Sequence, residues 1–354
     1  MNEKNKQKTK KQHYVAQSYL RRFTSDGKNL YVFDKTQNST FGPTSVVNVA
    51  HENYFYDFHD EAVVIAASAA NLDPQSAEKA LAVLDGQFNR VMEVALKFAK
   101  GATSAPSPEQ RMKMSLCAAI QLVRTRGFRN ELVENMEKMG TVLGESYLRL
   151  AKPELAKQVQ VEFKFNQDSV SLLHGKFLWN PEFIARVAAA LCNHIWVIGV
   201  NETANPLLTS DSPVVRQAHK PEQLFVPRPD FGPLYKRAID IAIESTLPGI
   251  ESEGVELVFP LSPECVLIFL ERSHFKSLEE KDGGRFALSD SDVERLNRLQ
   301  VLQSYRQIYS RSNDFRFAQE VCATHRDVCL RQSERIRVKT WERTEDPRLR
   351  SKPT

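Results

Sequence analysis

Four polar side chains have the chemistry needed to bind and process a phosphate-bearing substrate. His13 can act as an acid or a base, while Arg21 and Arg124 can each bind a phosphate through a planar set of N–H donors. Asp211 follows a predicted strand, a position where carboxylates orient a base or hold a metal. If the fold brings these residues together, they predict an enzyme acting on a phosphate-bearing substrate, with a nuclease-like hydrolase of nucleic acid as the leading hypothesis.

The same residues also have a structural interpretation. Gln121 and Arg124 lie three residues apart on one face of an otherwise apolar predicted helix, which also includes Phe128. A buried arginine needs a carboxylate, and Asp211 is the candidate partner. Such a pair either locks the helix to the sheet, or Gln121, Ser210 and Asn297 line a polar pocket in which Arg124 binds an anion. The alternative function is therefore a non-catalytic binding or sensing module.

Other kinds of site lack their sequence signatures. His51-Glu52 and 57–60 offer ligand atoms at spacings that match no fixed metal geometry, and the five cysteines form no CxxC pair, so no metal site is predicted. Glu162-Phe163-Lys164 has the acid-x-lysine form of restriction-type nucleases but lacks the partner Pro-Asp. No glycine-rich phosphate loop, nucleophile elbow or HExxH occurs. The residues point to no particular cofactor, and nucleic acid or a nucleotide is the partner that the phosphate chemistry favours.

The elements that must position these residues are long helices and short strands. Capping signals start helices at Asp73-Pro74, Ser107-Pro108, Asn180-Pro181 and Ser291, with ends expected at Gly101, about Met139 and Leu191 for the first three. Apolar β-branched or aromatic runs predict strands at Leu30–Asp34, Asn53–Tyr56, Ile195–Val200, Leu207–Thr209, Val255–Phe259 and Val266–Leu270. Residues 217–254 are predicted to form a long loop or lid. We therefore expect an α+β fold, with long helices packed on a mostly antiparallel sheet.

Composition and charge indicate a folded protein with basic ends. Of 354 residues, 42% are hydrophobic and 26% charged, the balance of an ordinary globular protein. No apolar run is long enough to span a membrane and no secretory signal is recognised, so we expect a cytoplasmic protein. Residues 1–12 and 331–354 each carry a net charge of +4 and are predicted to be flexible tails around a single domain at 13–330, whose net charge is −4. Such tails solubilise a chain or steer it towards nucleic acid, and no oligomeric state follows from them.

Several local patterns together resemble a known family. They are His13-Tyr14-Val15 with Tyr19–Phe23, Tyr31–Lys35, Asn48–Asp57, Gln121 with Arg124–Arg126, Leu208–Val214, Phe259–Pro263, and Asn297 with Ile308–Ser310. This set is similar to the prokaryotic family catalogued as domain of unknown function 4238 (DUF4238), which implies one family domain over residues 13–310. The chain departs from the family pattern at Ala16, where proline is usual, and at Arg126, where a threonine-proline pair usually follows Arg124. The resemblance implies no biochemical activity, and only analogy connects such families with defence or toxin systems.

Overall fold

The computed structural model describes residues 10–57, 74–220, 224–225, 239–245, 247–330 and 336–342. Its helices are α1 (Gln17–Leu20), α3 (Pro74–Ala99), α4 (Pro108–Val123), α5 (Arg126–Ala151), α6 (Pro153–Ala156), α7 (Gln167–Leu178), α8 (Pro181–Asn193), α9 (Asp290–Gln303), α10 (Arg316–Thr324) and α11 (Arg326–Leu330). Its strands are β1 (Lys11–His13), β2 (Asn29–Asp34), β3 (Ser39–Ser45), β4 (His51–Asn53), β5 (Ile195–Val200), β6 (Thr209–Ser210), β7 (Val215–Ala218), β8 (Leu224–Phe225), β9 (Ile239–Ser245), β10 (Val255–Ser262), β11 (Cys265–Leu270), β12 (Gly284–Ala287), β13 (Gln307–Ser310) and β14 (Ile336–Glu342).

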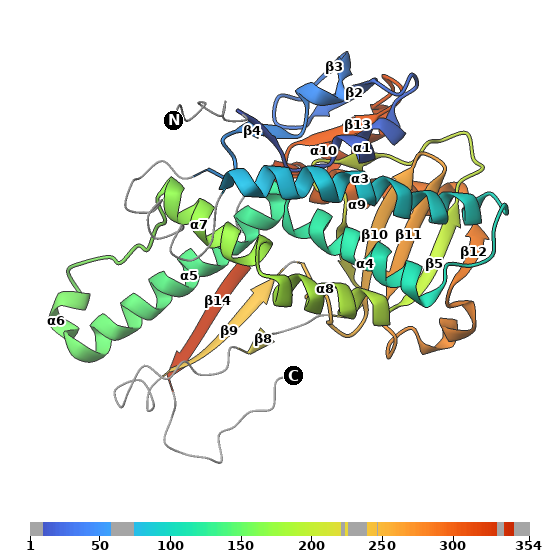
Figure 1. Ribbon diagram of the computed structural model, residues 1–354. Coiled ribbons are helices and arrows are strands. Elements are labelled where there is room, and N and C mark those ends of the chain that lie inside the picture. The colour runs from blue at the N-terminus through green and yellow to red at the C-terminus, as the bar shows by residue number, and fades with distance from the viewer. Residues whose placement is uncertain are drawn as a thin grey trace, which may run out of the picture.

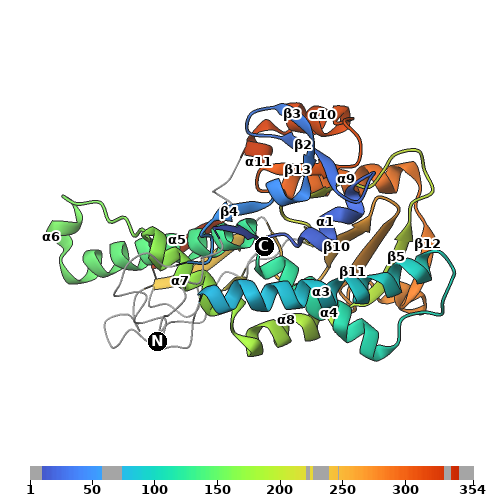
Figure 2. The ribbon, with the colours of Figure 1, turned by 45° about the horizontal axis from the view of Figure 1, so that its top comes forward.

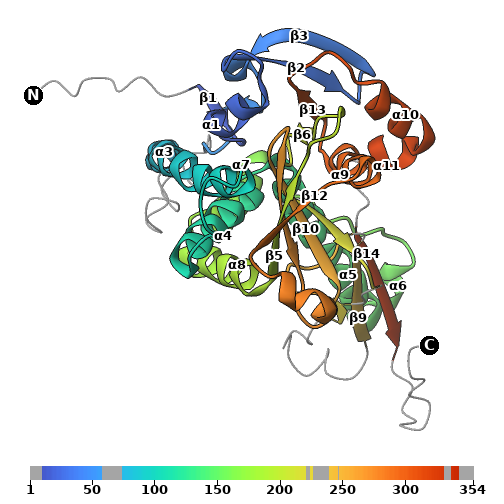
Figure 3. The same ribbon diagram turned by 90° about the vertical axis from the view of Figure 1, so that its right-hand side faces the viewer.

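A five-stranded sheet forms the centre of the fold. Its strand order is β12-β5-β11-β10-β7, and every neighbouring pair is antiparallel except β12 and β5. Successive side chains of a strand point to opposite faces, so Phe259 packs with α3, α4 and α8, whereas Val258 packs with Leu296 of α9. Figure 3 shows α3, α4 and α8 on one side of this sheet and α9 on the other. The expected α+β fold, with long helices on a mostly antiparallel sheet, is confirmed.

A second sheet joins the two ends of the domain. Its order is β3-β2-β13-β6, so a strand near the N-terminus pairs with one near the C-terminus, with Phe33 opposite Ile308. These two residues share an apolar cluster with Phe315 and Val321 of the α10 region. Figure 1 shows the blue β2 and β3 beside the orange β13. Residues more than 270 positions apart therefore belong to one folded unit.

The capping signals at Ser107 and Asn180 predict the starts of α4 and α8 correctly. Ser107 makes the expected capping box with Gln110, and Asn180 caps α8. Gly101 follows α3 with φ +73°, a conformation that glycine adopts without steric cost. The helix that begins at Pro108 does not run to Met139, however. It ends at Val123, and Thr125 caps a separate helix, α5, by accepting the Phe128 N–H.

Other helix and strand boundaries also differ from the prediction. Helix α9 is capped by Ser289 rather than Ser291, and β4 is His51–Asn53 rather than Asn53–Tyr56. The segment 217–254, predicted as a loop, contains β9, which pairs antiparallel with β14 inside the predicted tail 331–354. Residues 162–164 lie outside helices and strands, while Asp73 and positions 58–60 lie outside the described residues. Among the described helices, none is both long and apolar enough to cross a membrane.

Candidate functional site

The end of α4 holds the segment that follows β1. The fully buried Gln121 side chain accepts the Ala16 N–H through Oε1 and donates from Nε2 to the Tyr14 carbonyl, both at 3.3 Å. Arg124 Nη2 donates to the His13 carbonyl at 2.8 Å. The structure therefore brings His13, Gln121 and Arg124 together as expected. What Gln121 and Arg124 contact in this segment is its backbone.

Arg124 pairs with Asp85 of α3 rather than with Asp211. Its Nη1 lies 2.6 Å from Asp85 Oδ1, and the two side chains are 3% and 23% exposed. Burial lowers the pKa of Arg124, and the Asp85 carboxylate together with Tyr56 more than offsets this effect, so the net shift is upward. The guanidinium is thus charged and compensated by a carboxylate on the neighbouring helix.

Asp211 instead holds the turn before β13. Its carboxylate accepts the backbone N–H groups of Tyr305, Arg306 and Gln307 at 2.7, 2.7 and 2.8 Å. The residue is 1% exposed. Burial raises the pKa of Asp211, and the three N–H donors oppose that rise. Through these hydrogen bonds the carboxylate connects the segment around Asp211 to the turn before β13.

His13 is buried beside β4. Its Nε2 lies 3.2 Å from the Val47 carbonyl, which only accepts, so this nitrogen carries the proton. The Gln17 amide lies 3.3 Å from Nδ1, and the ring meets His51 edge-on with centroids 5.3 Å apart. Burial lowers the pKa of His13 to about 4. A histidine with that pKa is neutral at pH 7, which makes it a poor general acid.

A polar stripe on α9, which includes Asn297 and Gln300, contacts the buried segment 206–216. Asn297 accepts the Leu208 N–H at 2.7 Å and donates to the Pro206 carbonyl at 2.9 Å. Gln300 accepts from Ser210 Oγ at 2.8 Å and donates to the Pro213 carbonyl at 2.8 Å. Ser210 and Asn297 therefore both belong to the hydrogen-bonded contact between α9 and the segment 206–216.

Arg21 lies apart from this network. It is exposed, and within the described ranges its side chain makes no hydrogen bond or ion pair. The next residue, Arg22, is the one that contacts α3, where Nη2 donates to Asn89 Oδ1 at 2.6 Å and lies 3.3 Å from Glu93 Oε1. Six of the seven predicted site residues are thus buried, and the seventh is a surface arginine.

Arg126, which the sequence analysis did not nominate, connects two of the motifs. Its guanidinium lies 3.1 Å from Glu52 Oε2 and 4.6 Å from the centre of the Tyr305 ring. A Cβ at the neighbouring Gly127 would lie 2.5 Å from Ser212 Oγ, so a larger residue at this position would require the Ser212 side chain to move. The side chains of Glu52 and Arg126 are 39% and 36% exposed, which places this pair at the surface.

The largest of the open pockets that we describe lies elsewhere, between the end of α3 and the edge of the central sheet. Its volume is about 880 Å³. Its charged lining residues are Arg22, Lys100, Arg285, Glu202 and Glu264. The three cations come from segments far apart in the chain, and no local pattern in the sequence marks them as a group.

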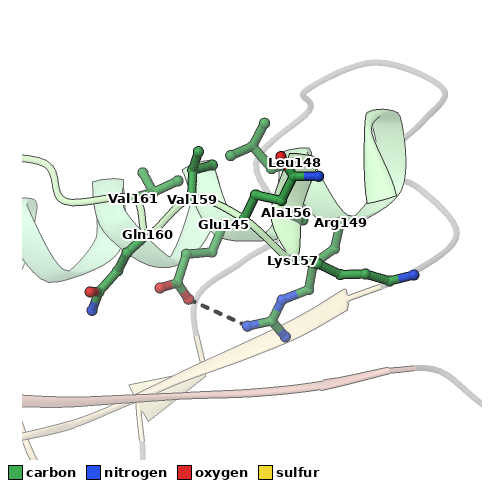
Figure 4. A pocket seen from close by; sticks show the side chains of 9 residues that line it. Glu145, Leu148, Arg149, Ala156, Lys157, Val159, Gln160 and Val161 are labelled. Carbon is green, nitrogen blue, oxygen red and sulfur yellow. Dashed lines mark hydrogen bonds and ion pairs between the residues drawn. The ribbon is translucent and has the colours of Figure 1, made fainter. Parts of the chain in front are cut away.

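Two other pockets have different linings. One of about 590 Å³ includes Asn297, with Asp290, Glu294, Asp314 and Glu320 around it. The other, of about 330 Å³, lies on the arm formed by α5 and α6, which extends from the rest of the fold (Figure 2). Figure 4 shows its cations, Arg149 and Lys157, and Arg149 pairs with Glu145 at 3.4 Å. Lys157 pairs with Glu154 at 2.9 Å, so neither cation of the arm pocket is left uncompensated.

The described residues contain no group of three or more His, Cys, Asp or Glu side chains arranged to hold a metal ion. No curated protein and no solved structure matches the chain. A family model described as "Protein of unknown function (DUF4238)" matches residues 11–314, which is most of the chain. The chain therefore belongs to the DUF4238 family.

Proposed function

We propose that this protein is a non-catalytic binding or sensing module, and that the polar residues first considered catalytic form a structural network. One observation supports this proposal most strongly. His13, Arg124 and Asp211 are 6%, 2% and 1% exposed. Both terminal nitrogens of Arg124 and the carboxylate of Asp211 contact backbone groups or a paired charge, and His13 contacts the Val47 carbonyl.

The alternative, an enzyme that hydrolyses nucleic acid, needs His13 and Asp211 to reach a substrate. A catalytic acid or base lies within hydrogen-bond reach of the proton it transfers and has a pKa near the working pH. Burial lowers the pKa of His13 to about 4. The Asp211 carboxylate already accepts three hydrogen bonds. The geometry thus favours the binding module.

The test is incubation of the full-length protein with RNA, DNA and nucleotides, with and without Mg²⁺ or Mn²⁺. We expect no turnover, and we expect His13→Ala and Asp211→Ala to lower the free energy of unfolding. Asp211→Ala removes the acceptor of three backbone N–H groups, one in a buried and two in part-buried hydrogen bonds, which costs about 3 kcal/mol. Asp327→Ala, at an exposed position of α11, is the control and should change neither property. Cleavage that disappears in both His13→Ala and Asp211→Ala would establish the enzyme instead.

A further inference from the structure

The pocket of about 880 Å³ has the size of a small-molecule site, for which 300–1,000 Å³ is usual. It lies where α3 ends beside β5 and β12, at the edge of the central sheet (Figure 1). Leu96, Val200 and Phe286 give it an apolar wall, and Phe286 is 38% exposed. Its polar wall carries the three cations.

Arg22 is the deepest of these cations. Its side chain is 9% exposed, and its Nε and Nη1 are buried without a hydrogen-bond partner. Its ion-pair partner, Glu93, is 51% exposed, so solvent weakens that pair. Burial lowers the pKa of Arg22. Buried N–H groups without an acceptor are costly, and an anion in the pocket would compensate this guanidinium.

Lys100 and Arg285 add two positive charges that no carboxylate of the described chain neutralises. Lys100 is exposed. Arg285 Nη1 donates to the carbonyls of Phe98 and Ala99 at 3.1 and 3.0 Å, which holds it at the C-terminus of α3.

The two carboxylates of the pocket do not cancel these charges. Glu264 forms an ion pair with Arg311, which does not line the pocket. Glu202 is exposed, as Lys100 and Arg285 are, so it offsets one of these two unpaired cations and leaves the other and the buried Arg22. The balance of buried and unpaired charge in the pocket is therefore positive.

We infer that this pocket binds a small phosphate-bearing ligand with an apolar or aromatic portion, as in a nucleotide. The phosphate lies among Arg22, Lys100 and Arg285, and the apolar portion lies against Phe286. This inference rests on the proposed binding function and gives that function a site and a ligand class. Since the pocket is small, it favours a free nucleotide over a nucleic-acid strand.

The experiment is isothermal titration of the full-length protein with ADP, pyrophosphate and adenosine, at low and at physiological salt. We expect ADP to bind, pyrophosphate to bind more weakly and adenosine to bind at least tenfold more weakly than ADP. Lys100→Gln should raise the Kd for ADP about tenfold, whereas Lys97→Gln, at an exposed position one turn earlier in α3, should not. Arg22→Gln should raise it further. Should Arg22→Gln fail to fold, the Lys100 and Lys97 variants decide the outcome.

Three results overturn the inference. One is the absence of ADP and pyrophosphate binding up to about 1 mM. A second is adenosine that binds as tightly as ADP. The third is equal effects of the Lys97 and Lys100 variants. Phosphate release from ADP, followed in the same samples, would contradict the proposed non-catalytic function, whereas failure to bind contradicts only the site assigned here.

Discussion

The buried histidines predict a specific loss of stability in acid. The folded His13 has a pKa of about 4, and His174, which is 1% exposed, has one of about 3. Burial is the first cause in both, and the Arg129 charge adds to it for His174. An unfolded histidine has a pKa of 6.5. Below pH 6.5 these histidines bind protons in the unfolded chain that they do not bind in the folded chain. The free energy of unfolding therefore falls as the pH drops below 6.5.

The size of this loss follows from the two pKa values. Between pH 8 and pH 5 each site contributes about 2 kcal/mol, because pH 5 lies about 1.5 units below the unfolded pKa and each unit is about 1.4 kcal/mol. His13 and His174 together lower the free energy of unfolding by about 4 kcal/mol over this range. That is a large part of the total stability of a typical domain, which is about 5–15 kcal/mol.

Urea unfolding at pH 8, 6.5 and 5, followed by tryptophan fluorescence, measures this loss. His13→Gln should cost about 1 kcal/mol at pH 8, because one hydrogen bond weakens, and should lose about 2 kcal/mol less than the parent protein on going to pH 5. His325→Gln, at a partly exposed position, should lose as much as the parent protein. If His13→Gln and the parent lose the same stability between pH 8 and pH 5, then His13 titrates as a solvated histidine. That outcome would refute its structural role and would reopen the catalytic hypothesis.

Two further sets of variants test the packing. Asp85→Asn should lower the free energy of unfolding by about 2 kcal/mol because it leaves the Arg124 guanidinium uncompensated. A double-mutant cycle of Arg124→Met with Asp85→Asn should show a coupling energy of about 1 kcal/mol or more. The cycle of Arg124→Met with Asp211→Asn should be additive within about 0.5 kcal/mol. Stronger coupling to Asp211 than to Asp85 would refute the observed pairing. Gly101→Ala should cost about 1–2 kcal/mol because φ is +73° there. Gly86→Ala, with open space around it in α3, should gain up to about 1 kcal/mol in the same urea assay.

The features predicted correctly depend on neighbours in the sequence. The Ser107 capping box and the Asn180 cap involve residues three positions apart, and the strand Ile195–Val200 is a continuous apolar run. Strand β9 also carries a local signal, because Ile239, Ile241 and Ile243 alternate with other residues, but the proline-rich surroundings favoured a loop. The error arose because the two local signals, the alternating isoleucines and the nearby prolines, favoured different structures.

The partner of Arg124 is a different kind of error. Asp85 and Asp211 offer the same carboxylate at separations of 39 and 87 residues, and no local pattern distinguishes them. The packing of α3 against the end of α4 makes Asp85 the partner of Arg124, since it brings the Asp85 carboxylate within 2.6 Å of the guanidinium. The cationic pocket has the same origin, because Arg22, Lys100 and Arg285 meet only through the tertiary fold. Pairings of this kind need coordinates.

The polar stripe on α9 shows why residues suited to an active site became structural. The segment 206–216 is largely buried, and apart from the short strand β6 and the start of β7 it has no ladder of its own to satisfy its backbone. Buried N–H and C=O groups must find partners. Asn297, Gln300 and Gln303 supply them at intervals of three residues, and Gln303 accepts the Arg216 N–H at 2.9 Å. A row of amides on the buried side of a helix is therefore better interpreted as support for an irregular segment than as a ligand site, unless an open cavity adjoins it. In this protein Asn297 reaches an open cavity of about 590 Å³, whose lining holds four carboxylates and one cation, Arg316, so its net charge is negative and repels a phosphate.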